Sequence, residues 1–203
     1  MKSTVIALGA LLWLAAAVRA QEPNAESSTV ERAIHVCAAC HGQEGRSSAP
    51  VFPSLAGQVP LYTISQLRDF RSQTRSEGDW QAYMWGISAL LDDATISGLA
   101  AYFAEQKPAA GKPGNAKLVE AGRKLYSDGV PSRGVRACAS CHGDNAEGAS
   151  VFPRLAGQQA PYVMRQLKVF RTRLRPHGVI MADEAKVLTD EEIRAVAQYV
   201  QSL

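Results

Sequence analysis

The pentapeptide Cys-x-x-Cys-His occurs twice in this chain of 203 residues, at 37–41 and at 138–142. The two copies contain all 4 cysteines of the sequence, so no cysteine remains for a disulfide. This pattern is the attachment signature of c-type haem. Two intervening residues let both cysteine sulfurs reach one edge of the haem porphyrin, and the histidine that follows directly can lie beneath the haem iron. The pattern predicts two covalently bound haem c groups, attached through Cys37 and Cys40 and through Cys138 and Cys141.

Two other chemistries use the same residue types. Zinc needs four ligands close together, which two motifs about a hundred residues apart would supply only if the fold paired them. A thioredoxin-like dithiol site would need a βαβ pattern around the motif, and none is visible. Duplication of the motif, together with an export signal, favours haem.

The amino terminus has the pattern of a secretory signal peptide over residues 1–20. Lys2 supplies a positive charge, an uncharged apolar run covers 5–18, and Val18-Arg19-Ala20 resembles a cleavage site before Gln21. The apolar run is shorter than the ~18–20 residues of a bilayer-spanning helix. We therefore expect an exported, periplasmic protein. An uncleaved anchor is the alternative.

The mature chain contains an internal repeat. The segment Phe-Pro-x-Leu-Ala-Gly-Gln at 52–58 returns at 152–158, an offset of 100 residues. Further along, Met84 matches Met181 at an offset of 97, so the register changes by three residues between Arg71 and Met84. Repetition over this length indicates a tandem duplication.

The duplication predicts two haem domains, at 21–108 and 109–203. Residues 107–114, rich in Pro, Gly and Ala, are expected to form an exposed linker between them.

Each domain is expected to be helical, which predicts an all-α fold. Pro60 and Pro161 suit the first turn of a helix. Thr189 and Glu192 form a potential capping box, and Asp92 is the matching cap in the first repeat. We see no convincing strand pairs. The expected helices cover residues 28–36, 61–71, 93–104, 116–125, 162–173 and 190–201.

The sixth ligand of each iron determines its chemistry. Met84 and Met181 are related by the repeat and each precedes a closing helix, whereas Met164 has no counterpart and is expected to pack in the core. A methionine sulfur opposite histidine favours ferrous iron and raises the potential. Both could instead be core residues. His177 and His35 compete for the same role and would lower the potential.

The proximal histidine needs an acceptor for its second ring nitrogen. Pro53 and Pro153 match in the repeat, so their backbone carbonyls are our candidates for this hydrogen bond. Alternatively, the two prolines only stiffen the loop below the haem.

These motifs resemble those of the cytochrome c4 family of periplasmic di-haem cytochromes, over essentially the whole mature chain. The resemblance rests on the two haem motifs, the repeated segments at 52–58 and 152–158, and the two methionines before the closing helices. It implies two class I-type cytochrome c domains around a pseudo-twofold axis, with electron transfer between the haems. It also implies axial iron ligands His41 with Met84 and His142 with Met181.

The charges of the two halves differ. Residues 21–108 hold 6 basic and 10 acidic side chains, and residues 109–203 hold 14 basic and 9 acidic ones. Such a dipole steers encounters with charged partners. We expect a basic surface on the second domain to face an acidic partner; a solvated helix face is the alternative. The surface would comprise Arg165, Lys168, Arg171, Arg173 and Arg175.

The sequence therefore predicts a monomeric electron carrier between respiratory donors and a terminal oxidase or reductase. Its partners would be redox proteins, such as a membrane cytochrome complex or a periplasmic reductase, with peripheral membrane association and no nucleic acid. We find no substrate site. The alternatives are the electron-accepting subunit of a dehydrogenase or a di-haem peroxidase, and the paired methionines argue against the peroxidase.

Overall fold

The computed structural model describes residues 25–78 and 81–203. Within these ranges the only β-type pairings are two isolated bridges, Val130 with Val135 and Ala149 with Phe152. The predicted all-α fold is therefore confirmed. The signal peptide predicted over residues 1–20, with its cleavage site before Gln21, lies outside the described residues.

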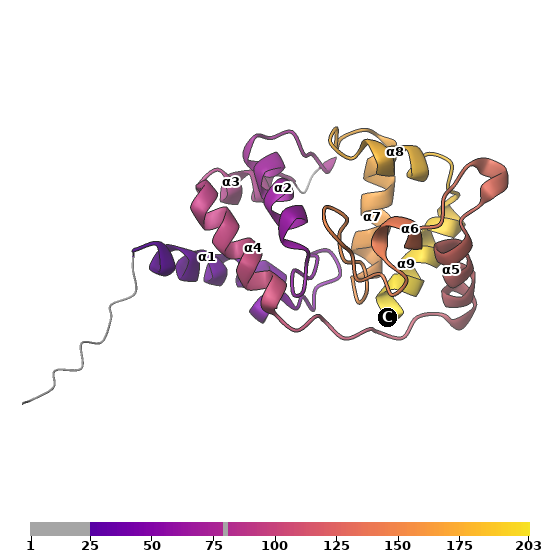
Figure 1. The fold of residues 1–203 in the computed structure, drawn as a ribbon, viewed down its shortest axis with the longest axis horizontal. Coiled ribbons are helices and arrows are strands. Elements are labelled where there is room, and N and C mark those ends of the chain that lie inside the picture. The colour runs from indigo at the N-terminus through magenta and orange to yellow at the C-terminus, as the bar shows by residue number, and fades with distance from the viewer. Residues whose placement is uncertain (1–24, 79–80) are drawn as a thin grey trace, which may run out of the picture.

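The first half of the chain folds around one central helix. Helix α4 packs on both α1 and α2, and α3 packs on α2 (Figure 1). Ile96, Leu99 and Phe103 on α4 are almost inaccessible to solvent. We call this unit the N-terminal domain. Its helices are α1 (Ala25–His41), α2 (Pro60–Arg71), α3 (Gln81–Ser88) and α4 (Asp93–Glu105), with a 3-10 turn at Gln43–Gly45.

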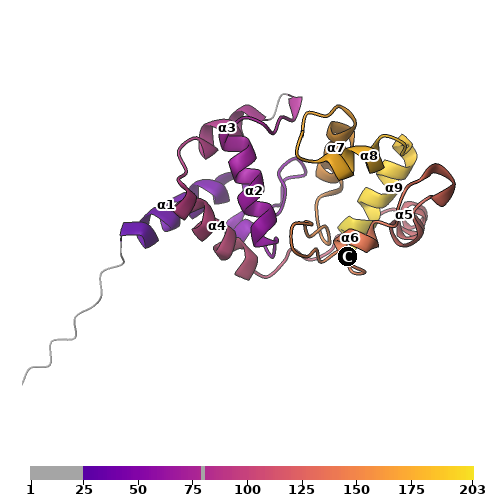
Figure 2. The ribbon, with the colours of Figure 1, turned by 45° about the horizontal axis from the view of Figure 1, so that its top comes forward.

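The second half repeats this arrangement as the C-terminal domain. Its last helix packs on the first and third α-helices of the domain, and α8 packs on α7 (Figure 2). Tyr126, Ile193 and Val200 are fully buried in its core. The elements are α5 (Ala116–Asp128), a 3-10 turn (Pro131–Arg133), α6 (Ala139–His142), α7 (Ala160–Arg171), α8 (Val179–Ala185) and α9 (Asp190–Ser202).

The helix starts follow the predicted capping chemistry. Pro60 is the first residue of α2, and the matching proline lies in the first turn of α7. The Asp92 side chain accepts a 2.7 Å hydrogen bond from Thr95 N at the start of α4. Thr189 and Glu192 form the predicted capping box of α9.

Four helical features differ from the prediction, and one of them is the unpredicted four-residue helix α6. Helix α1 continues through the haem motif to His41 instead of ending at Val36. Helices α3 and α8, of 8 and 7 residues, were not predicted. They are too short to show a clear apolar period, and tertiary contacts with α2 and α7 stabilise them.

The connection between the domains has no regular secondary structure over the predicted linker, residues 107–114. It runs along the outside of both domains (Figure 1). Pro108 packs against Gly57, and Lys112 N donates a 2.9 Å hydrogen bond to Gln201 O. The linker thus lies on the surface but is attached at both ends.

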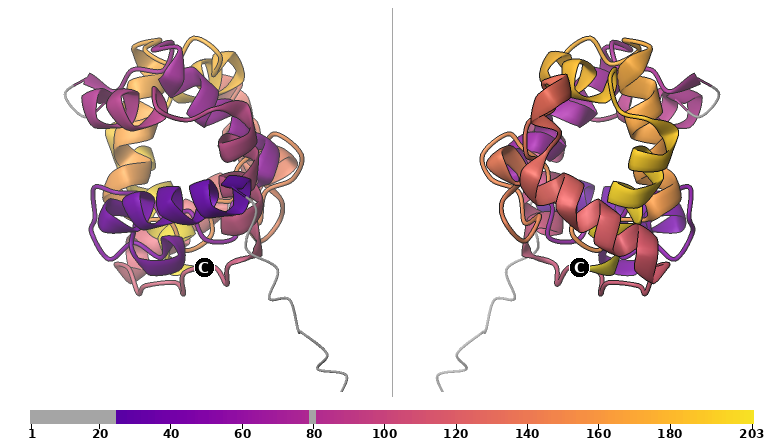
Figure 3. Two further views of the ribbon diagram at one scale, coloured as in Figure 1. Left: turned by 90° about the vertical axis from the view of Figure 1, so that its left-hand side faces the viewer. Right: turned by 90° about the vertical axis from the view of Figure 1, so that its right-hand side faces the viewer.

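The first helices of the two repeats lie at opposite ends of the long axis, with α1 foremost in one end-on view and α5 in the other (Figure 3). This placement is that of two units related by an approximate twofold axis between them.

Candidate haem-binding cavity

Each haem motif lies at the end of a helix and is followed by a glycine. The first motif is the last part of α1, and the second lies on α6. Gly42 and Gly143 then have φ of 79° and 83°. A Cβ at Gly42 would lie 2.1 Å from the Arg46 carbonyl oxygen. Only glycine permits this sharp turn, which directs the next segment back under the histidine.

The two motif histidines have the same surroundings. His41 Nδ1 lies 2.9 Å from Pro53 O, and His142 Nδ1 lies 2.9 Å from Pro153 O. The predicted role of the two proline carbonyls is thus confirmed. A carbonyl only accepts, so Nδ1 carries the proton and Nε2 keeps its lone pair. Burial lowers the pKa of both rings, which favours this neutral form.

The repeated phenylalanine contributes to the same loop. The Phe52 ring meets His41 edge-on with centroids 6.1 Å apart, and Phe152 meets His142 at 6.3 Å. The repeated segment therefore orients each histidine with one carbonyl and one aromatic edge.

A single cavity of about 1100 Å³ extends through both domains. Its walls are mainly apolar, with Phe70 and Leu99 in one domain and Phe170 and Leu167 in the other. It is larger than the usual site for one small ligand, ~300–1,000 Å³. All eight predicted site residues line it: Cys37, Cys40, His41, Met84, Cys138, Cys141, His142 and Met181.

The two methionines reach this cavity from the unpredicted helices. Met84 lies on α3 and Met181 on α8, and both are half-buried. Met164 packs against the C-terminal core, as predicted and as Met181 also does, but it is not among the residues that line this cavity.

Of the competing histidines, His177 also lines the cavity, whereas His35 is not among its lining residues. The Nδ1 of His177 lies 2.7 Å from Asp69 Oδ1 across the domain boundary, with the imidazole 65% exposed. His35 is exposed on α1. Neither has the buried, oriented ring that His41 and His142 share.

The cysteine environment does not suit the dithiol interpretation. Burial raises the pKa of Cys37 and of Cys138 to about 11. A reactive dithiol needs the opposite shift, because the thiolate is the nucleophile. Among the residues that the structure describes, no three His, Cys, Asp or Glu side chains form a metal-binding group, so the zinc interpretation gains no support.

Polar atoms on the cavity wall provide a further test of fit to haem, which carries two carboxylates. Arg75 Nε, Arg154 Nε and Gln166 Nε2 are buried, and the described part of the chain gives these three atoms no hydrogen-bond partner. Buried donors are normally satisfied. Donors of this kind beside an apolar cavity suit an amphipathic, anionic cofactor.

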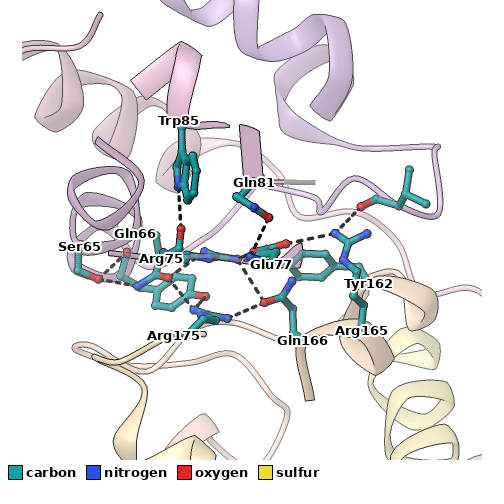
Figure 4. A network of polar contacts seen from close by, with 12 residues as sticks. Ser65, Gln66, Arg75, Glu77, Gln81, Trp85, Tyr162, Arg165, Gln166 and Arg175 are labelled. Atoms are coloured by element: carbon teal, nitrogen blue, oxygen red, sulfur yellow. Dashed lines mark hydrogen bonds and ion pairs between the residues drawn. The ribbon is translucent and has the colours of Figure 1, made fainter. Parts of the chain in front are cut away.

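The domain interface beside the cavity is reciprocal (Figure 4). Arg75 donates to Gln66 Oε1 at 2.8 Å and, across the boundary, to Gln166 Oε1 at 3.3 Å. Arg175 donates to Gln166 Oε1 at 2.8 Å and to Gln66 Oε1 at 2.6 Å. Each guanidinium also lies 4.3 Å from the ring centroid of a phenylalanine of its own domain. Residues 100 positions apart thus exchange places, as a pseudo-twofold axis requires.

One acidic residue breaks this symmetry. Glu77 forms a buried ion pair with Arg75 and lies 3.5 Å from Arg165, while the corresponding position in the other domain is His177. Burial alone would raise the pKa of Glu77, but Arg75 keeps it below the ordinary value. The reciprocal contacts of Arg75 and Arg175 show that the repeat register persists at least to residue 75.

The predicted basic docking surface is wrong in part. Arg165 donates to Val51 O at 3.0 Å and Arg175 is buried, so both face the N-terminal domain of the same chain. Lys168 and Arg171 pair with Asp190. Arg165 and Arg175 thus belong to an internal interface, whereas Lys168 and Arg173 are exposed.

Sequence reasoning also missed the polar interface residues. Gln58, Gln66 and Arg75 each have a counterpart 100 residues later, and this periodicity was their only signal. Nothing local in the sequence distinguishes an interface residue from one that serves its own domain.

Two tandem helical domains, each with a Cys-x-x-Cys-His motif and a methionine on one apolar cavity, define a di-haem class I cytochrome c. Comparison with known proteins agrees. The family model described as cytochrome c matches residues 119–203. A cytochrome c4 of Azotobacter vinelandii is 40% identical over 178 residues, covering 83% of this chain and 84% of the relative.

Two further matches extend over most of the chain. The structure of reduced recombinant cytochrome c4 from Pseudomonas stutzeri superposes with a TM-score of 0.79 at 35% identity, covering 87% of this chain and 97% of that one. A thiosulfate dehydrogenase electron acceptor of Thiomonas intermedia is 35% identical over 202 residues, covering 97% of this chain and 88% of the relative.

The chain belongs to the cytochrome c4 family. It is a di-haem electron-transfer cytochrome, and its two Cys-x-x-Cys motifs fit covalent attachment of haem c. No helix in the described ranges is both long and apolar enough to cross a bilayer.

Proposed function

We propose that this protein is a periplasmic electron carrier that transfers electrons between respiratory donors and a terminal oxidase or reductase. The observation that carries the proposal is the shared cavity, which brings two equivalent His and Met pairs to one apolar space. Two centres in one molecule allow an electron to enter at one domain and leave from the other.

In this proposal the four cysteines hold the haems through thioethers, and the axial pairs are His41 with Met84 and His142 with Met181. The orientation of each histidine, with Nδ1 on a proline carbonyl and Nε2 free, supports the proximal role. Haem supplies one-electron chemistry, and methionine ligation favours a high potential. With both axial positions filled, neither iron has a site for substrate, which supports a carrier over an enzyme.

The rim of the cavity supports transfer to protein partners. Val36 and Tyr83 in the N-terminal domain, and Val151, Val179 and Ile180 in the other, line the cavity yet are exposed by between 49% and 72%. Exposed apolar side chains around a redox centre suit brief contacts with another protein.

We place the signal peptide at residues 1–20 and the two domains at 21–108 and 109–203, and expect the exported protein to be monomeric. The boundary lies within the irregular linker that separates the two helical units, which supports this division. Mass spectrometry of the periplasmic protein tests the cleavage and the haem count together.

The first experiment is a redox titration of the holo-protein followed by visible and near-infrared absorption. We expect two high-potential steps, two haems per chain and the weak near-infrared band of ferric haem with a methionine ligand. Met84→Ala and Met181→Ala should each remove half of that band, whereas the control Met164→Ala should leave it unchanged. A high-spin haem in the unmodified protein that binds peroxide rapidly would overturn the carrier proposal and favour the peroxidase.

A second candidate is a more specific form of the first. The Thiomonas intermedia relative is named a thiosulfate dehydrogenase electron acceptor. If this chain has that role, the enzyme with thiosulfate should reduce it rapidly, with saturation at low carrier concentration. Reduction no faster than that of an unrelated cytochrome c would exclude this candidate and leave the general carrier function intact.

A further inference from the structure

The loop below each histidine is bonded on both sides. The carbonyl of the Pro53–Ser54 peptide accepts the His41 Nδ1 proton at 2.9 Å. The N–H of the same peptide group, on Ser54, donates a 2.8 Å hydrogen bond to Gln158 Oε1 of the other domain. One peptide plane therefore joins the proximal histidine of the N-terminal domain to a side chain of the C-terminal domain.

The arrangement is repeated in the opposite direction. The carbonyl of the Pro153–Arg154 peptide accepts the His142 Nδ1 proton at 2.9 Å, and Arg154 N donates to Gln58 Oε1 at 2.8 Å. The two relays cross the boundary in opposite senses. Each histidine is thus linked to the glutamine of the other domain rather than to that of its own.

Both glutamines are held in one orientation. Gln158 Nε2 donates to Ser54 O at 3.0 Å, and Gln58 Nε2 donates to Arg154 O at 3.1 Å. A backbone N–H can donate to the amide oxygen of a glutamine but not to its NH2 group. The two backbone donors therefore fix the positions of Oε1 and Nε2 in each side chain. Gln58 is only 8% exposed and Gln158 only 6%, so water does not compete strongly for these bonds.

A hydrogen bond to the N–H of a peptide polarises the group and makes its carbonyl a stronger acceptor, an effect of about 10–30% per bond. A stronger acceptor draws the Nδ1 proton and gives the imidazole more anionic character. A more basic ligand stabilises ferric over ferrous iron. The glutamine of one domain can therefore lower the potential of the iron in the other.

We propose that Gln158 is a positioning residue for the His41 centre and Gln58 for the His142 centre, so that domain contact sets both reduction potentials. The inference rests on the proposed function, in which these histidines are the proximal ligands. It makes the interface part of the redox chemistry as well as of the fold.

The test uses holo-protein with Gln158→Met, which keeps the length of the side chain and removes the acceptor. Each haem is followed separately by its NMR-resolved methyl signals during a redox titration, with signals assigned from the Met84→Ala and Met181→Ala variants. At a fixed potential we expect the ratio of oxidised to reduced His41 haem to be about threefold lower. At 59 mV per tenfold change, this corresponds to a reduction potential that is ~28 mV higher. The His142 haem should change little. Gln58→Met should produce the converse.

Gln159→Met is the matched control. Gln159 is also buried, and its Nε2 donates 2.6 Å to Ser47 O of the other domain, but neither histidine-linked peptide is involved. We expect it to leave both potentials unchanged. Equal shifts of both haems, no shift in either glutamine variant, or the same shift in the control would each overturn the proposal.

A second variant distinguishes loss of the hydrogen bond from a general effect of misfolding. Gln158→Glu retains an acceptor oxygen, now charged, and should move the His41 potential in the opposite direction to Gln158→Met. A shift in the same direction would count against the relay. The near-infrared methionine band of the unmodified protein separates failure of this proposal from failure of the proposed function. If the band is present but neither glutamine variant shifts a potential, only the role of the glutamines is rejected. If the band is absent, the axial ligand assignment is rejected.

Discussion

The two domains deliver the same haem motif by different routes. In the N-terminal domain one continuous helix, Ala25–His41, carries the motif, whereas in the C-terminal domain the first helix ends at Asp128 and a loop leads to the short helix Ala139–His142. Yet both histidines lie 2.9 Å from a proline carbonyl. The loop after each motif and its hydrogen bond therefore position the histidine, whereas the helices that precede the motif can differ between the domains.

The interface shows a second difference. Arg75 and Arg175 make equivalent contacts with Gln66 and Gln166, but among the described residues Arg75 alone has a buried carboxylate partner, Glu77. The position of Glu77 is filled by the exposed His177 in the other domain. The two proposed iron sites, with matching ligands, thus lie near differently charged surroundings.

The largest expected effect comes from the two arginines. Arg75→Met leaves Glu77 buried beside the more distant Arg165, and breaking a buried pair costs about 3–5 kcal/mol. Arg175→Met loses hydrogen bonds without stranding a charge, at about 1–3 kcal/mol. Denaturant unfolding of the holo-proteins gives both free energies.

A control tests the cause of that difference. Adding Glu77→Gln to Arg75→Met should restore part of the lost free energy of unfolding, because no charge is then stranded. If the double variant is as unstable as the sum of the single ones, the ion pair does not explain the asymmetry between the domains.

The next effect concerns the helix crossing in each domain. A Cβ at Gly122 would lie 2.1 Å from Ala195 O, a backbone atom, whereas one at Gly98 would lie 2.6 Å from a methyl group of Val30. Overpacking costs about 1–3 kcal/mol and alanine regains ~1 kcal/mol of helix propensity. We expect Gly122→Ala to destabilise clearly and Gly98→Ala to be close to neutral. Thermal unfolding of the two variants would refute this ranking if Gly98→Ala were the more damaging.

The sequence predicted the features that local chemistry decides. The cap residues Asp92 and Thr189 correctly predicted where the closing helices start. The repeated prolines predicted the carbonyl groups that accept hydrogen bonds from His41 and His142. These groups interact within a few residues or within one loop, so their pattern in the chain is enough to find them.

Contacts between the repeats were not predictable in the same way. Arg165 and Arg175 looked like a docking surface because sequence records charge but not which face another domain covers. The helices that carry Met84 and Met181 are too short for a period to be read. Gln58 and Gln158 were visible as repeats, but their partners lie 96 and 104 residues away in the chain.

Acid should reveal the asymmetry of Glu77. Its pKa in the folded protein is below the ordinary ~4.3, so its contribution to stability is complete above the ordinary value and is lost as pH falls through the lowered one. Glu77→Gln should therefore show a shallower loss of unfolding free energy on acidification than the unmodified protein. Parallel slopes for the two proteins would contradict a special role for Glu77.

The smallest effect distinguishes the caps of the closing helices. Thr189→Ala removes the bond to Glu192 N, but the Glu192 carboxylate still accepts from the residue 189 N–H at 2.8 Å, so we expect a loss of only about 0.5 kcal/mol. Among the described residues no second side chain caps the start of α4 beside Asp92, so Asp92→Ala should lower the thermal midpoint more. Ser substitution at either site, which retains a cap oxygen, should recover most of the loss. Equal midpoints for the two alanine variants would mean that the second half of the capping box adds nothing, and that the two closing helices start with equal stability.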